Sequence, residues 1–423
     1  MASKNKNPLT TAVIIGLAVV VVIAGLITAN INYALRVPGG NDFLLHWVGF
    51  RNLITEGTSP YSQQTAEAVQ AFADGSLVQE NDQQPRAVYP LYAIVIYLPF
   101  ALIKDFVVAR AIWMTVLELN LILLAYLSLK LSGWKPNTIL LVFYYLFAVL
   151  FFHSILPVVT GNASIIVAVL ITGGLLAVKN RADELAGVLF AFSTIKPQIA
   201  LLFVVFVIFW SLRQRRQKIV IWFIFTTLLL VISSMLIIPD WIPQNFMEIL
   251  RFLQTKQIIN LQTALGELLP GFGERVGWAI SGVLVLLLIV EWGLSSRNRF
   301  QGFLFGGLMT LLVTQWIGLP VETGNFIVLF PAITVIFEAW SRRWQNAGGF
   351  YIFICLILLL LIIYLIFFQT IGSGYPPQQN PALYLSLPMF LFGALYWSRW
   401  WILQPASDLA IEHFGDEDTS FFE

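Results

Sequence analysis

The sequence predicts an all-α protein that crosses a membrane many times, and two observations carry this prediction. Of the 423 residues, 58% are hydrophobic and only 11% are charged, whereas a soluble domain carries about 25% charged residues. Apolar runs also recur along the chain, many of them near the length of about 20 residues that a membrane-spanning helix needs. We therefore expect one transmembrane domain over residues 1–402 and a short polar cytoplasmic tail over 403–423.

The apolar runs place twelve helices along the chain. We expect the first run, 9–31, to be retained, because it is longer than the roughly 7 to 15 apolar residues of a signal peptide and no small-residue cleavage site follows it. The run 184–212 is interrupted at Lys196-Pro197, so we expect two short helices there. The remaining runs lie at 106–129, 138–158, 164–178, 218–238, 276–294, 300–318, 325–340, 349–370 and 382–402.

The positive-inside rule gives the orientation and decides the ambiguous apolar segment 89–103. Lysine and arginine in short loops accumulate on the cytoplasmic side of a membrane. If segment 89–103 does not cross, every short basic loop falls on one side, from Lys130 and Lys135 to Arg399. We therefore expect both termini in the cytoplasm and segment 89–103 as a re-entrant or interfacial piece near the outer surface.

Two extracytoplasmic loops remain, 32–105 and 239–275. In each loop, large apolar residues share one face of a helical pattern, and polar residues such as His46 and Glu248 lie elsewhere. This pattern is typical of helices that lie in the membrane interface. The apolar faces are Phe43, Leu44, Trp47, Phe50 and Ile54 in the first loop and Trp241, Phe246, Ile249, Leu250 and Leu253 in the second.

Asp42 is the first candidate for chemistry, because it follows the flexible "PGGN" and opens the helix of the first loop. Aspartate at a helix start commonly caps free backbone N–H groups. Alternatively, Asp42 is a general base that an acceptor hydroxyl reaches at the membrane surface. His46, one turn later, could orient Asp42 or bind a phosphate, or it could be a polar surface residue.

Lys196 is the second candidate, because a lysine inside a membrane run is costly and commonly marks a function or a buried partner. Its side chain could extend to the outer interface. We prefer the interpretation that Lys196 binds a phosphate group at the membrane surface. Arg110, in the first turn of the second predicted helix, could join it.

Further candidates lie in turns on the same extracytoplasmic side. Asn162 in "VVTGNAS", and Glu322 and Asn325 in "GLPVETGNF", either cap the helices that follow or bind a polar head group. Tyr89 stands at the entry of segment 89–103, where an aromatic residue is commonly an interfacial anchor. All of these turns are predicted on the same side of the membrane, and this shared side is stronger evidence for a functional site there than any one motif.

The sequence also excludes several classes of site. The formal net charge of +1 gives no polybasic signature for nucleic acid. Phosphate loops, dinucleotide fingerprints and zinc-helix motifs are absent from the sequence. With three histidines and the single Cys355, a metal centre or an internal disulfide is not expected. No nucleotide site is readable either, so a sugar or phosphate donor would arrive from the lipid phase, and we expect no cofactor and no metal.

Four motifs stand in order between the first helix and about residue 218. They are "GGNDFLLHWVGFRNLITEGTSPYS", "YPLYAIVIYLPFALI", "TGNAS" and "LAGVLFAFSTIKPQIALLF". Together they resemble the GT-C superfamily of membrane glycosyltransferases, and most closely glycosyltransferase family 87, the polyprenyl-phosphate-mannose-dependent α-mannosyltransferases.

The resemblance implies a GT-C type fold and an inverting transfer from polyprenyl phosphate to a lipid or glycan acceptor. It implies that Asp42 is the base and that Lys196, with Arg110, faces the donor phosphate. The family's late "SP…W-x-H-H" pattern appears here as "GLPVETGNF", so Glu322 or Asn325 would take its place. We expect a monomer in the cytoplasmic membrane.

A secondary transporter or lipid flippase is the rival interpretation. Transporters carry polar sites near the middle of the bilayer and internal repeats. Here the candidate residues gather at one face, and the two halves show no clear repeat. A ligase or polymerase of lipid-linked glycans would share this sidedness, but it would need a larger polar loop than 239–275.

Overall fold

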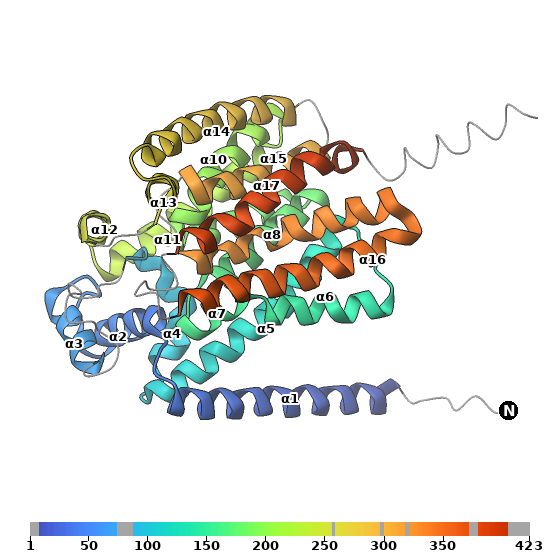
Figure 1. Cartoon of the computed structure of the whole chain (residues 1–423). Coiled ribbons are helices and arrows are strands. Elements are labelled where there is room, and N and C mark those ends of the chain that lie inside the picture. Colours follow the sequence, from blue (N-terminus) through green and yellow to red (C-terminus); the bar gives the residue numbers. More distant parts are fainter. Residues whose placement is uncertain are drawn as a thin grey trace, which may run out of the picture. The chain divides into compact units, whose positions relative to one another are not determined.

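The computed structural model describes residues 8–73, 88–255, 259–296, 300–317, 322–371 and 380–404. Over these ranges the chain folds into seventeen α-helices and two short 3-10 helices, with no strand (Figure 1). The predicted fold class, an all-α membrane protein, is confirmed. Most of the predicted tail 403–423 and the loop residues Arg297 and Arg299 lie outside the described ranges.

The chain divides into two compact units. The N-terminal unit comprises residues 1–88, 93–119 and 158–162, and the main unit comprises residues 89–92, 120–157 and 163–423. Each unit is described by itself below.

The N-terminal unit begins with α1 (Pro8–Arg36), and its other helices gather near the C-terminal end of α1 (Figure 1). Side chains along α1 are widely exposed, Val21 to 70%, which suits a helix that faces lipid. A glycine flanks α2 at each end. Gly40 precedes the helix and Gly57 follows it, and both adopt the left-handed backbone conformation, which glycine tolerates best. The other elements are α2 (Asn41–Glu56), α3 (Gln63–Ala73), the turn η1 (Leu91–Ala93), α4 (Ile94–Ala101) and the first half of α5 (Phe106–Ser132).

The part of segment 89–103 that belongs to the N-terminal unit, 93–103, folds back onto α2. Trp47 Nε1 donates hydrogen bonds to the carbonyls of Phe100 and Ile103 at 3.1 and 3.2 Å. Helix α4 has eight residues, which rise about 12 Å, much less than the roughly 30 Å of a bilayer's hydrocarbon core. The helix is therefore too short to cross a membrane by itself, in line with the assignment of this segment to the first outer loop.

The polar face of helix α2 is less exposed to water than the sequence predicts for it. Phe43, Trp47 and Phe50 are buried as expected, but His46 is also only 4% exposed, and Ile54 is 41% exposed. The reason is that α4 covers the side of α2 that the sequence pattern left polar. Helices α2 and α4 are about 50 residues apart in sequence. The hydrophobic periodicity of neither helix therefore predicts that they pack together.

The main unit is a helical bundle with two short helices, α12 and α13, at one end of it (Figure 1). Helix α15 is largely enclosed, because every residue from Gly302 to Trp316 is buried. The elements are α6 (Thr138–Leu150), α7 (Phe152–Thr160), α8 (Ser164–Lys179), α9 (Asp183–Ser193), α10 (Pro197–Arg213), α11 (Gln217–Ile237), α12 (Trp241–Thr255), α13 (Leu261–Leu268), α14 (Gly273–Ser295), α15 (Phe300–Ile317), η2 (Thr323–Leu329), α16 (Phe330–Thr370) and α17 (Pro381–Leu403).

Two predicted breaks of helices are confirmed. The run 184–212 divides into α9 and α10, with Pro197 as the first residue of α10, where proline is well tolerated. Helix α16 turns back on itself at Gln345, whose φ is 42° and ψ −111° (Figure 1). A Cβ on Gly348 would lie 3.0 Å from the Cα of Ser341, a distance that a straight helix does not allow. The two predicted helices 325–340 and 349–370 are thus the two arms of α16.

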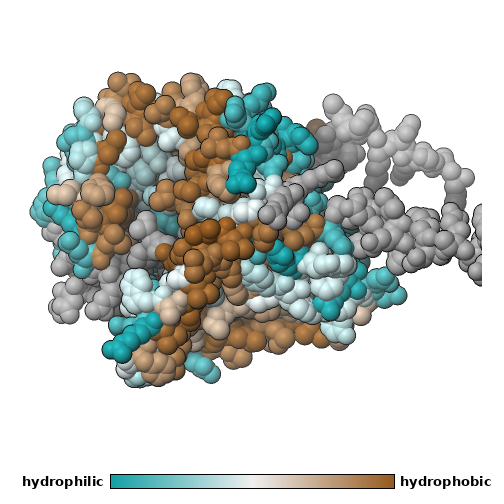
Figure 2. Space-filling model, turned by 90° about the horizontal axis from the view of Figure 1, so that it is seen from above, coloured by the Kyte–Doolittle hydropathy of each residue, from teal (hydrophilic) through white to brown (hydrophobic). Residues whose placement is uncertain are grey.

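The length and composition of the helices indicate which of them could cross a membrane. Among the described residues, six helices are long and apolar enough to cross, or seven if the bent pair α6–α7 is one span. Hydrophobic side chains cover much of the face seen in Figure 2, as expected for helices in contact with lipid. The count of twelve adds α8, α9, α10 and α17 and counts α16 as two, and it stays a prediction.

Helix α12 is amphipathic, and its polar side faces the rest of the main unit. Phe246 is 58% exposed, as expected for an apolar face, while Asn245 and Glu248 are buried. Trp241, expected on the apolar face, is also buried, because its ring packs edge-on against Tyr92 at 5.9 Å. The apolar side of α12 thus faces outward, which is the arrangement of a helix lying in a membrane surface.

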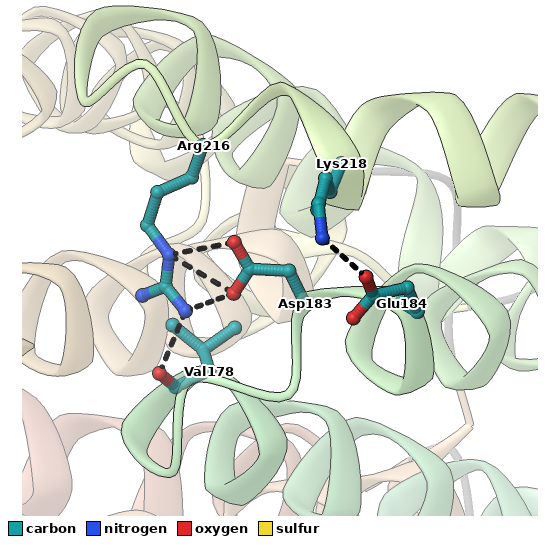
Figure 3. Close-up of polar contacts among 5 residues, drawn as sticks. All are labelled: Val178, Asp183, Glu184, Arg216 and Lys218. Atoms are coloured by element: carbon teal, nitrogen blue, oxygen red, sulfur yellow. Dashed lines mark hydrogen bonds and ion pairs between the residues drawn. The ribbon is translucent and has the colours of Figure 1, made fainter.

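Ion pairs join α9 to α11 at the end of α10 that lies far from Pro197 (Figure 3). Arg216 binds the Asp183 carboxylate and the carbonyl of Val178, and Lys218 Nζ lies 2.7 Å from Glu184 Oε1. These contacts fix the turn between α10 and α11.

Candidate active site

Asp42 lies in the first turn of α2, one residue after its first residue. The N-cap of α2 is Gly40, and the Asp42 carboxylate accepts a hydrogen bond from Asn162 Nδ2 at 2.9 Å. The interpretation of Asp42 as a simple N-cap is therefore wrong. Two predicted site residues that stand 120 positions apart in sequence are brought together in the N-terminal unit.

Gly161 explains how Asn162 comes this close to α2. Its φ is +75°, and a Cβ at this position would lie 2.4 Å from the Cβ of Phe43. Only glycine tolerates both the left-handed backbone and that approach. Trp113 Nε1 also donates a hydrogen bond of 2.9 Å to the Gly161 carbonyl, so the "TGNAS" turn is held from two sides.

Tyr97 lies beside these residues, although the sequence did not single it out. Its ring stacks on those of His46 and Trp113, each with 4.8 Å between ring centres. The Tyr97 hydroxyl is buried and has no hydrogen-bond partner among the described residues. Burial raises the pKa of this hydroxyl well above its ordinary value, and the nearby Asp42 carboxylate raises it further. Tyr97 therefore keeps its proton and can donate it in a hydrogen bond.

His46 is buried among aromatic rings in the same unit. Besides Tyr97, its ring stacks on Phe50 with 6.1 Å between ring centres. A role for His46 in orienting Asp42 or in binding a phosphate stays a prediction.

Arg110 supports the loop that leads into α2. Its Nη1 donates to the carbonyl of Val37 at 2.9 Å, and its guanidinium lies 5.8 Å from the ring centre of Tyr33. A Cβ on Gly39 or Gly40 would meet the Arg110 side chain at 2.8 Å, so the two glycines let the loop close over this arginine. Contact of Arg110 with a donor phosphate stays a prediction.

Lys196 is the centre of a second group of predicted residues, in the main unit. It is 2% exposed, so the interpretation that it extends to the surface is wrong. Its Nζ donates to Asn325 Oδ1 at 2.5 Å and lies 5.6 Å from the ring centre of Tyr89. The structure thus brings together Tyr89, Lys196 and Asn325, which come from three distant parts of the sequence.

Two further contacts hold segment 89–92 in the main unit. The Tyr92 hydroxyl donates to the Thr194 carbonyl at 3.1 Å, in the turn just before Lys196. Asn245 of α12 donates to the Tyr89 carbonyl at 3.1 Å. Asn245 was not predicted from the sequence, because a polar residue on an amphipathic helix is expected to be exposed, whereas Asn245 is buried.

Glu322 precedes the turn η2. Its carbonyl accepts a hydrogen bond of 2.9 Å from the backbone N–H of Asn325, so its backbone helps to shape the turn. A substrate-binding role for the Glu322 side chain stays a prediction. The N-terminal unit therefore contains Asp42, His46, Arg110 and Asn162, and the main unit contains Tyr89, Lys196, Glu322 and Asn325.

Within the part of the chain that the structure describes, no cluster of three or more histidine, cysteine, aspartate or glutamate side chains could hold a metal ion.

Comparison with known proteins identifies a family. The family model of glycosyltransferase family 87 matches residues 87–315, which is more than half of the 423 residues. The matched region contains Tyr89, Arg110, Asn162 and Lys196. No curated protein matches the chain.

Proposed function

The chain belongs to glycosyltransferase family 87, and we propose that it moves mannose from a polyprenyl-phosphate donor to a hydroxyl group of a lipid or glycan acceptor. The transfer inverts the configuration of the anomeric carbon and takes place at the extracytoplasmic face of the cytoplasmic membrane. Family membership makes the chain a glycosyltransferase, and its apolar helices make it a membrane protein. The donor, the acceptor and the roles of the residues are our proposal.

Asp42 is the general base in this proposal, and its contact with Asn162 is the observation that carries it. Asn162 holds one carboxylate oxygen, Oδ2, and the other has no hydrogen-bond partner among the described residues. The carboxylate is only partly buried, so an acceptor hydroxyl can reach it.

Lys196 binds the donor phosphate in this proposal. It is the N-cap of α10, and a helix N-terminus attracts anions through its free N–H groups and its dipole. A buried ammonium adds a full positive charge in a medium that screens it weakly. The contacts with Asn325 and Tyr89 keep the Lys196 side chain in one place.

The reaction requires one proton transfer and one displacement. Asp42 accepts the proton of the acceptor hydroxyl while its oxygen forms a bond to the anomeric carbon. The bond from that carbon to the phosphate oxygen breaks, and its electron pair leaves with polyprenyl phosphate. Lys196 stabilises the charge that develops on the leaving phosphate.

The sidedness rests on α10. Its 17 residues span about 26 Å, close to the thickness of the hydrocarbon core of a bilayer. The basic turn at its far end contains Arg213, Arg215, Arg216 and Lys218, which the positive-inside rule assigns to the cytoplasm. Lys196, at the other end, is then at the extracytoplasmic surface.

The test measures mannose transfer from polyprenyl-phosphate mannose to acceptor lipids by the protein in vesicles. We expect Asp42→Asn to lower turnover by about 10³-fold or more, because general base catalysis contributes up to about 10⁴-fold. Asp105→Asn is the matched control, since Asp105 is exposed and only caps α5 through the N–H of Val108. Normal turnover by Asp42→Asn would show that Asp42 is not the general base. If the wild-type protein moves the lipid-linked sugar across the vesicle membrane without transferring the sugar to an acceptor, the flippase interpretation would be favoured.

A further inference from the structure

The turn η2 is buried over its whole length, and side chains from three helices hold it. His153 Nδ1 of α7 lies 2.8 Å from the carbonyl oxygen of Thr323. Ser164 Oγ of α8 donates to the next carbonyl, that of Gly324, at 3.2 Å. The following residue is Asn325, whose side-chain oxygen accepts the hydrogen bond from Lys196. Three successive residues of one turn are therefore fixed by three different helices of the main unit.

The chemistry of these contacts leaves each group one orientation. A carbonyl oxygen only accepts, so His153 Nδ1 must donate its proton to Thr323. An ammonium group only donates, so Asn325 must present its oxygen to Lys196 rather than its amide nitrogen. A short 3-10 turn has weak internal hydrogen bonds, so its exact course depends on such outside partners.

Aromatic side chains packed around His153 also hold its ring in place. It is fully buried, and the rings of Phe151, Phe152 and Phe326 lie 5.1 to 5.3 Å from it, centre to centre. Phe326 is itself part of η2. The imidazole is thus clamped between α7 and the turn, with its Nδ1 aimed at the peptide group two residues before Asn325.

We propose that His153 is a positioning residue for the sugar donor. By holding the Thr323 carbonyl, it sets the course of η2, which places the Asn325 oxygen and thereby the Lys196 ammonium. The proposal rests on the proposed role of Lys196 at the donor phosphate. Displacements of about 1 Å at a reacting group can cost about 10²-fold in rate, so a turn that carries such a contact must be fixed.

The test compares His153→Leu with His153→Asn. Asparagine can place an amide N–H close to where histidine places its Nδ1–H, whereas leucine offers no donor. We expect His153→Leu to raise the KM for polyprenyl-phosphate mannose about tenfold, the cost of about one buried hydrogen bond, with a smaller effect on kcat. We expect His153→Asn to stay within about twofold of the wild type in both constants, with the same pH profile.

A control separates positioning from general loss of packing. Ser398→Ala removes another buried hydrogen bond of the main unit, from Trp340 Nε1 at 2.9 Å, and it should leave the donor KM unchanged. If His153→Leu does not fold, Ser164→Ala tests the same turn through the neighbouring carbonyl and should raise the donor KM in the same sense. A defect of His153→Asn equal to that of His153→Leu, or a changed pH profile, would overturn the proposal.

Lys196→Gln distinguishes failure of this inference from failure of the proposed function. If Lys196→Gln binds donor normally, the role of Lys196 at the phosphate is wrong and the inference loses its basis. If Lys196→Gln loses donor binding while His153→Leu keeps a normal donor KM, only the inference is wrong. We expect both to be impaired, and the double variant to be no worse than Lys196→Gln alone, because both act through one contact.

Discussion

Two basic residues of the main unit occupy the same position in successive helices. Lys196 is the N-cap of α10, and Arg216 is the N-cap of α11. A cation at a helix N-terminus is unfavourable, because it faces the positive end of the dipole. At Arg216 the protein itself supplies the compensation, since the Asp183 carboxylate and the Val178 carbonyl bind the guanidinium (Figure 3).

Lys196 is built differently. It is buried to 2% exposure, and two of its contacts are with the side-chain amide oxygen of Asn325 and the aromatic ring of Tyr89. Both partners come from segments far from Lys196 in the sequence. A basic N-cap bound by a carboxylate and a carbonyl serves the fold, whereas in our proposal the buried Lys196 is placed for an anionic ligand.

Lys196→Met should have the largest effect. Loss of the charge that stabilises the leaving phosphate should lower kcat/KM by about 10²- to 10³-fold, which is typical when one electrostatic contact to a transition state is removed. Initial rates over a range of donor concentrations measure this effect. Rates within a few-fold of the wild type would show that Lys196 has only a structural role and that the comparison fails.

Asn325→Asp should have the next largest effect, because it makes the Lys196 site resemble the Arg216 site. A carboxylate beside Lys196 would pair with the ammonium and repel the donor phosphate. We expect the donor KM to rise about 10- to 100-fold while thermal unfolding in detergent stays at or above the wild-type temperature. A donor KM unchanged from the wild type would contradict the assignment of this site to an anion.

Arg216→Met should change stability rather than catalysis. Asp183 and Arg216 are each about 15% exposed, so removing the arginine leaves a largely buried carboxylate without its partner, at a cost of about 1–3 kcal/mol. The temperature of unfolding should fall, and the donor KM should not change. A large rise in the donor KM at unchanged stability would erase the distinction between the two sites.

Lys218→Ala should have the smallest effect. Lys218 is 69% exposed in its pair with Glu184, and such surface pairs contribute little. Neither the unfolding temperature nor transfer should differ measurably from the wild type. A clear loss of transfer would indicate that the basic turn has a role beyond orientation in the membrane.

Much of the fold could be predicted from local signals in the sequence. The division at Lys196-Pro197 followed from one proline, because proline cannot continue a helix from the preceding turn. The short α4 followed from the distribution of charges over the loops. The burial of His46 did not follow, because it depends on α4 packing against α2.

The candidate sites were predictable as residues but not as pairs. Asp42 and Asn162 were both singled out, yet their hydrogen bond joins positions 120 residues apart, and a single sequence carries no signal for such a contact. Asn325 was singled out as a turn residue, and its bond to Lys196 came only from the structure. Tyr97 and His153 were not singled out, because one aromatic or histidine residue in an apolar segment is indistinguishable from core packing.

The most direct test of the account is equilibrium binding of polyprenyl-phosphate mannose to the wild type, Asp42→Asn and Lys196→Met in vesicles without acceptor. Asp42 is proposed to bind the acceptor hydroxyl and Lys196 the donor phosphate, so only the Lys196 variant should lose affinity for the donor. Asp42→Asn should bind the donor within about twofold of the wild type, and Lys196→Met should bind it at least about tenfold more weakly. Wild-type affinity in Lys196→Met, or equal loss in both variants, would contradict the division of roles.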